Sequence, residues 1–159
     1  MSQPEALLWT NLRQSIPSHW QHQRIENRTG GGVPDLYLCA EGISFWVELK
    51  ITKTNAVKVS AFQHAWNYAH HRAGGINFYL VSPLKSPNLY LFAGDQGKNL
   101  MIHGLKSNGQ GPVVECLWSG SGFGDLITVM HDIAKSRVRE LMVEGSWVGV
   151  GSGRDSGSG

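Results

Sequence analysis

Residues 32–50 read GVPDLYLCAEGISFWVELK and contain the clearest structural pattern in the chain. Two mainly apolar runs, residues 35–40 and 43–51, flank the pair Glu41-Gly42. The pattern predicts two antiparallel strands joined by a two-residue hairpin loop. Because the loop residues are 41 and 42, cross-strand partners have residue numbers that sum to 83.

This register sorts the side chains of the hairpin by chemistry. On one face Leu36 lies opposite Val47 and Leu38 opposite Phe45; on the other, Tyr37 lies opposite Trp46 and Asp35 opposite Glu48. Opposed like charges destabilise a sheet by about 0.2–1 kcal/mol, so the pair predicts a cation between them. Lys50 points the same way as Glu48, about 6–7 Å along the strand. Carboxylates in this arrangement suit Mg²⁺, although a solvent-facing strand with a Glu48–Lys50 pair gives the same pattern.

The rest of the chain predicts a single α/β domain over residues 1–148 with a mixed sheet. Helices are expected at residues 2–16, 60–73 and 125–141, and further strands at 20–26, 76–81, 89–92 and 113–118. The helix at 60–73 is expected to bury an apolar stripe of Phe62, Ala65, Trp66 and Ala69. Residues 149–159, almost entirely Gly and Ser, predict a flexible tail.

Composition excludes several classes of protein. Hydrophobic residues make up 41% and charged residues 16% of the 159 residues, which predicts a folded core. No apolar run is long enough for a membrane span, and the first residues do not resemble a secretory signal. Two cysteines, Cys39 and Cys116, form neither a disulfide framework nor a zinc motif, so a cytoplasmic location is expected.

The charge is uneven along the chain. Residues 1–75 carry 7 Lys and Arg against 5 Asp and Glu, whereas residues 76–159 carry 7 of each sign. The positive surplus therefore lies in the half that contains the hairpin. Nucleic-acid binding and random scatter both account for so small a surplus.

The residues Gly32-Val33-Pro34-Asp35 and Trp46-Val47-Glu48-Leu49-Lys50 resemble the Pro-Asp and Glu-x-Lys elements of the PD-(D/E)XK nuclease superfamily. Within it, the chain resembles Holliday-junction resolvases and small VRR-NUC-type phage nucleases over roughly residues 2–81. The resemblance implies a restriction-endonuclease-like mixed β-sheet flanked by helices, a homodimer, and the cytoplasm of a bacterial or phage-infected cell.

The resemblance also implies roles for residues in the hairpin. Asp35, Glu48 and the carbonyl of Leu49 would bind Mg²⁺, for which Mn²⁺ would substitute. Lys50 would orient or activate the attacking water. In several such families a Gln early in the next helix joins the site, and Gln63 occupies that place.

Two of these positions have competing interpretations. Junction resolvases add a Glu on the first helix, which Glu5 matches, but Glu5 also completes a capping box with Ser2. Glu26, beside the hairpin, is the alternative third acid. Gln63 likewise fits a capping box with Ser60.

The function expected from these observations is a magnesium-dependent DNA endonuclease, with branched DNA as the first substrate. The alternatives are a sequence-specific cutting or nicking enzyme of homing type, a catalytically inactive DNA-binding module, and a structural protein. Four basic residues around the hairpin are candidates for phosphate contact: Arg24, Arg28, Lys53 and Lys58.

Overall fold

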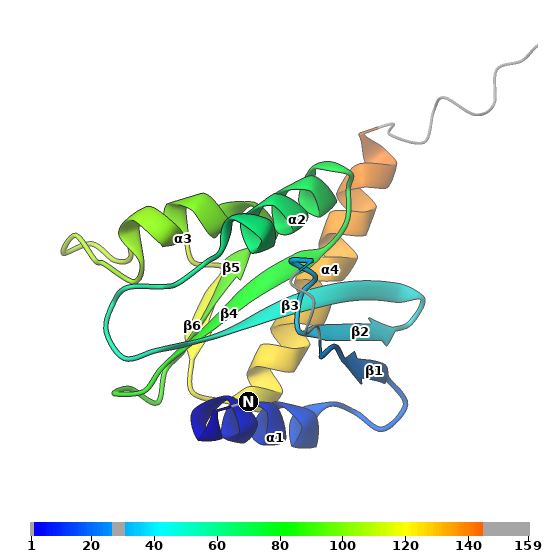
Figure 1. The fold of residues 1–159 in the computed structure, drawn as a ribbon. Coiled ribbons are helices and arrows are strands. Elements are labelled where there is room, and N and C mark those ends of the chain that lie inside the picture. Colours follow the sequence, from blue (N-terminus) through cyan, green and yellow to red (C-terminus); the bar gives the residue numbers. More distant parts are fainter. Residues whose placement is uncertain (1, 27–30, 145–159) are drawn as a thin grey trace, which may run out of the picture.

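A mixed six-stranded sheet with helices on both faces forms the framework of the computed structural model (Figure 1), as the sequence predicts. The structure describes residues 2–26 and 31–144; Arg28 and the predicted Gly/Ser tail lie outside these residues. The strands are β1 (Gln21–Arg24), β2 (Leu36–Ala40), β3 (Ile43–Thr52), β4 (Asn77–Pro83), β5 (Leu89–Ala93) and β6 (Trp118–Gly120). The helices are α1 (Gln3–Ser15), α2 (Ala61–Arg72), α3 (Gly97–His103), α4 (Phe123–Val143) and the short 3₁₀ helix η1 (Gly94–Gln96).

The β2–β3 hairpin has the predicted register. Leu36 pairs with Val47, and the ladder continues to the pair that closes the loop, Ala40 and Ile43. Both loop residues have positive φ, 53° at Glu41 and 75° at Gly42. Two positive φ values in a two-residue loop match the right-handed twist of the flanking strands, and this fixes the register.

The strand β3 lies in the middle of the sheet, where the pairing changes from antiparallel to parallel. It pairs antiparallel with β2 and parallel with β4, and α2 provides the crossover between the two parallel strands. Figure 1 shows α1 and α4 on one face of the sheet and α2 and α3 on the other. Alternate side chains of β4 therefore enter different hydrophobic clusters, Phe78 and Leu80 the one under α1 and α4, and Tyr79 and Val81 the one that includes Leu100 of α3. The buried apolar side chains of β3 join only the first.

The predicted apolar stripe of α2 is wrong. Phe62 is 68% exposed, and Ala65 and Ala69 are exposed as well, whereas the one fully buried residue of the helix is Asn67. Asn67 is buried because Asn77 of β4 donates to both its side-chain and backbone oxygens, at 2.7 and 3.0 Å. A satisfied polar pair therefore replaces the apolar contact that the periodicity suggested.

The second half differs from the prediction in two places. The strand expected at residues 113–118 is instead β6, which begins at Trp118, and Val114 is buried in a loop. The short helices η1 and α3, of 3 and 7 residues, were not predicted from the sequence. None of the described helices is long and apolar enough to cross a membrane.

Candidate active site

Asp35 directly precedes β2, and its side chain points into the candidate site. Its backbone carbonyl accepts a hydrogen bond from the Ile25 N–H at 2.7 Å, and its side-chain Oδ2 accepts one from the Leu49 N–H at 2.8 Å. The preceding turn contains Gly32, whose φ is +76° and whose missing Cβ would overlap the Phe62 carbonyl oxygen. Only glycine suits this position, because the turn packs against the first turn of α2. The turn thus places the Asp35 carboxylate beside β3, on the Leu49 N–H.

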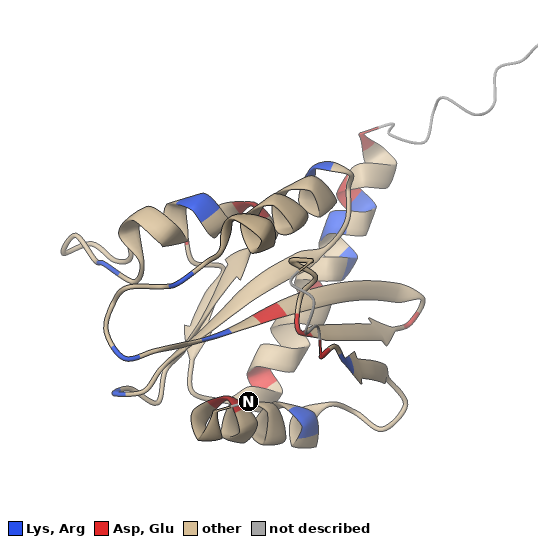
Figure 2. Ribbon diagram, in the orientation of Figure 1, with Lys and Arg blue, Asp and Glu red and all other residues tan. Residues whose placement is uncertain are grey.

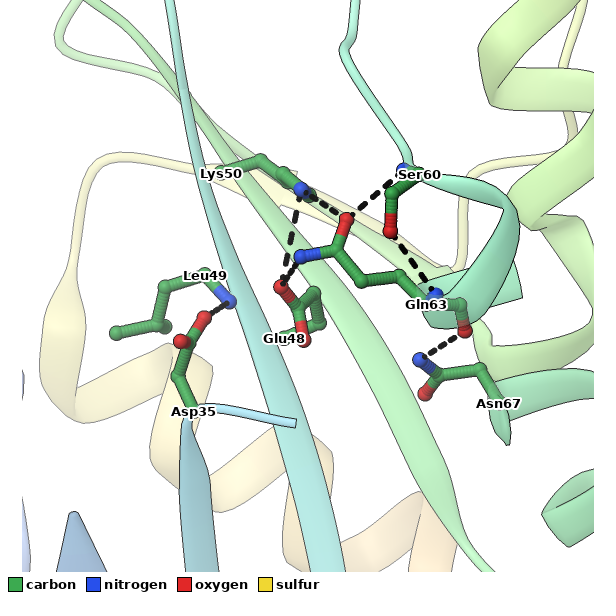
Figure 3. Close-up of polar contacts among 7 residues, drawn as sticks. All are labelled: Asp35, Glu48, Leu49, Lys50, Ser60, Gln63 and Asn67. Carbon is green, nitrogen blue, oxygen red and sulfur yellow. Dashed lines mark hydrogen bonds and ion pairs between the residues drawn. The ribbon is translucent and has the colours of Figure 1, made fainter. Parts of the chain in front are cut away.

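Glu48 and Lys50 meet Gln63 of α2 above the sheet (Figure 3). Gln63 donates from Nε2 to Glu48 Oε1 at 2.8 Å and accepts from Lys50 Nζ at Oε1, at 2.7 Å. The Lys50 ammonium lies 3.7 Å from Glu48 Oε1. One amide group therefore fixes the carboxylate and the ammonium relative to each other.

Gln63 also satisfies the alternative interpretation of the sequence. Its backbone N–H donates to Ser60 Oγ at 3.1 Å, and its side-chain Oε1 accepts from the Ser60 backbone N–H at 3.0 Å. This is a complete capping box at the start of α2. The two roles do not compete, because a carbonyl oxygen has two lone pairs. The cap positions the amide that contacts Glu48 and Lys50.

The site strongly favours the neutral form of Glu48. The side chain is only 2% exposed, and burial, followed by the charge of Asp35, raises its pKa from 4.5 to about 8. The Lys50 ammonium opposes this shift without cancelling it. Burial also raises the pKa of Asp35, against the opposing effects of its Leu49 hydrogen bond and the charges of Arg24 and Lys50. Two desolvated carboxylates side by side need additional positive charge before both ionise.

These groups line one pocket of about 260 Å³, to which α1, β1 and the β3–α2 connection contribute Glu5, Arg24 and Lys58. The third acid that reaches this pocket is therefore Glu5, since Glu26 is exposed and does not line it. Ser2 Oγ still accepts from the Glu5 N–H at 3.4 Å, so the cap of α1 is present as well. Lys53 is exposed and lies outside the pocket.

Arg24 is held in the pocket by an aromatic ring. Its guanidinium carbon lies 5.6 Å from the ring centroid of Trp9 on α1, within the range of a cation–π contact. Its Nε and Nη1 atoms are buried and have no hydrogen-bond partner among the described residues. An oriented guanidinium with free donors can bind an anion. Trp9 was not among the residues predicted for the site.

The donor set fits a hard divalent cation. The Glu48 Oε2 atom is buried and, among the described residues, has no hydrogen-bond partner. Asp35, Glu48 and the Leu49 carbonyl would hold the ion, and Mg²⁺ typically takes one or two carboxylates and keeps several waters. No group of three or more His, Cys, Asp and Glu side chains within residues 2–26 and 31–144 is arranged to hold a metal. Two carboxylates and one carbonyl are oxygen ligands of the kind that Mg²⁺ prefers.

No known family model and no curated protein matches the chain. Among solved structures, it is similar to Hjc, a Holliday junction resolvase from the archaeal hyperthermophile Archaeoglobus fulgidus. The match has 14% sequence identity and a TM-score of 0.44, and it covers 58% of this chain and 75% of that chain. At this level of similarity, no residue role transfers from Hjc to this chain.

Proposed function

We propose that this protein is a magnesium-dependent DNA endonuclease that hydrolyses phosphodiester bonds. The observation that carries the proposal is the meeting of Asp35, Glu48, Lys50 and Gln63 in one pocket, with a buried carboxylate oxygen that has no partner among the described residues. Without a cation, the two carboxyl groups are compatible only when Glu48 is protonated and hydrogen-bonds to Asp35; a bound divalent ion would take the place of that proton.

The chemistry follows from where each group lies. A bound Mg²⁺ ion would supply Lewis acidity toward a phosphate oxygen and a water of lowered pKa. Lys50, held by Gln63, places its positive charge where the attacking water and the phosphorane charge would lie. Attack of that water on phosphorus breaks the P–O3′ bond and leaves a 5′-phosphate and a 3′-hydroxyl.

Basic residues around the pocket would bind the DNA backbone. Arg24 and Lys58 line the pocket, and Lys53 lies five residues before Lys58 on the same exposed connection. Figure 2 shows basic residues along the end of β3, the β3–α2 connection and α3. Such contacts give affinity without sequence preference, which suits a substrate recognised by its shape. Branched DNA is therefore our first choice of substrate.

The test compares two lysines three residues apart. Four-way junctions, flaps and linear duplexes are incubated with Mg²⁺ or EDTA and with wild-type protein, Lys50→Ala, Lys53→Ala or Asp35→Asn. We expect cleavage of branched DNA with Mg²⁺ only. Lys50→Ala and Asp35→Asn should each lower kcat at least 100-fold, whereas Lys53→Ala should mainly raise KM.

The same experiment separates the alternatives. Cleavage of a duplex at one sequence would favour a cutting or nicking enzyme of homing type. Binding without cleavage on every substrate would mean an inactive DNA-binding module, and equal cleavage by wild type and Lys50→Ala would contradict the proposed site.

A homodimer is part of the proposal, because a symmetric junction has two strands to cut. Sedimentation of the protein with and without junction DNA measures its oligomeric state.

A further inference from the structure

A second cavity adjoins the candidate active site. It measures about 510 Å³ and shares Lys50, Lys58 and Gln63 with the pocket that contains the carboxylates. The two cavities therefore lie on either side of the same three side chains. A strand whose phosphate occupies the first cavity can pass its next nucleotide beside Lys50 and Lys58, toward the second cavity.

The surface of this second cavity is mainly apolar, although Ser60 and Gln63 line it beside the two lysines. Val57 and Val59 are 4% and 7% exposed, while Lys58 between them is exposed, as expected for an extended segment with alternating faces. Met101 of α3 lines the cavity and is 46% exposed. An apolar depression with lysines at its rim has the composition of a site for a nucleobase and its sugar, rather than for a phosphate.

The cavity is also fixed in shape. The Leu105 N–H, just after α3, donates to the Asn55 carbonyl at 2.8 Å, which ties α3 to the β3–α2 connection. Gly104 packs against the same carbonyl, at a φ of +56° that favours glycine. Met101 and the two valines therefore keep their separation before any ligand arrives, and less ordering is needed on binding.

We propose that this cavity binds the base of an unpaired nucleotide next to the phosphate that is cleaved. The inference rests on the proposed nuclease function and specifies its substrate. In a continuous duplex that base is paired and stacked, and extracting it costs a few kcal/mol. At a flap or gap the base is already free, so the inference favours these branched substrates over a fully paired four-way junction. The cavity thus selects DNA with an unpaired nucleotide at the cleavage position, which phosphate contacts alone cannot do.

The test uses two neighbouring residues of α3. Met101 lines the cavity, whereas Ile102, which is 59% exposed, does not. Met101→Ala and Ile102→Ala are compared on a flap and on a nicked duplex of the same sequence. We expect Met101→Ala to lower kcat/KM about tenfold on the flap and to leave the duplex rate unchanged. Ile102→Ala should match wild type on both substrates.

A change in the DNA provides a second test that does not depend on protein folding. Replacing the unpaired nucleotide by an abasic site should lower kcat/KM about tenfold for wild type and have no further effect on Met101→Ala. Equal values for both alanine variants, or an abasic effect that persists in Met101→Ala, would overturn the inference and leave the nuclease function intact.

Binding without metal distinguishes this failure from failure of the proposed function. Fluorescence anisotropy of the labelled flap in EDTA should show weaker binding by Met101→Ala and unchanged binding by Ile102→Ala. If this difference appears but no DNA is ever cut, the cavity is assigned correctly and the enzyme assignment is wrong. If neither variant changes binding or cleavage, the cavity does not bind a base.

Discussion

Replacing Glu48 by Gln should remove a large dependence of stability on pH. The pKa of Glu48 is raised from 4.5 to about 8 in the folded protein. Folding therefore favours the protonated form, so the stabilisation is complete below about pH 4.5 and is lost as the pH rises through 8. A shift of this size corresponds to about 5 kcal/mol, about 4 of it between pH 5 and 9. This is a large share of the stability of a typical domain.

The assay is urea unfolding of metal-free protein in EDTA at these two pH values. Wild type should lose about 4 kcal/mol more than Glu48→Gln between pH 5 and pH 9. Gln is isosteric and can still accept the hydrogen bond from Gln63. Adding Mg²⁺ should restore stability to wild type at the higher pH and have little effect on the variant. Parallel pH profiles for the two proteins would refute the burial argument.

Five further substitutions test the local structure. Ser60→Ala removes one half of the cap and should lower the free energy of unfolding by about 1 kcal/mol in urea, with cleavage nearly unchanged. Gln63→Ala should also lower kcat about tenfold or more, because it frees Lys50 and Glu48. Equal activities of the two variants would contradict a role for the Gln63 side chain beyond the cap. Gly32→Ala should lower cleavage strongly and reduce the melting temperature, since its Cβ would overlap the Phe62 carbonyl at a φ of +76°; unchanged values would contradict the packing of this turn. Phe62→Ala should change the free energy of unfolding by less than about 0.5 kcal/mol, whereas Phe45→Ala in the core should cost about 3–5 kcal/mol, and similar costs would mean that Phe62 is buried.

The hairpin could be predicted from sequence because its determinants are local. The Glu41-Gly42 loop and the alternation around it define the register, and that register places Asp35 beside Glu48. Lys50 followed from strand alternation. The position of Gln63 came from the resemblance alone, and its double role depends on how α2 packs across the sheet.

The face of α2 could not be predicted from hydropathy. Phe62, Ala65 and Ala69 suggested an apolar stripe, but the helix turns Asn67 inward, where Asn77 satisfies it. Burying a polar pair costs little free energy when both partners are hydrogen-bonded. The periodicity of one helix does not reveal a partner that lies ten residues away on another element. The contact between Arg24 and Trp9 was missed for the same reason, because it joins α1 to the edge strand β1.

A crystal soaked in Mn²⁺ shows whether a divalent ion binds between Asp35 and Glu48. Mn²⁺ scatters anomalously and should substitute for Mg²⁺, so its position can be measured without any assumption about activity. We predict one strong anomalous peak between the carboxylates of Asp35 and Glu48, with metal–oxygen distances of roughly 2.0–2.3 Å, and no peak in Glu48→Gln crystals. A well-diffracting soak with Mn²⁺ bound elsewhere and nothing between these two carboxylates would contradict the metal site and, with it, the proposed nuclease.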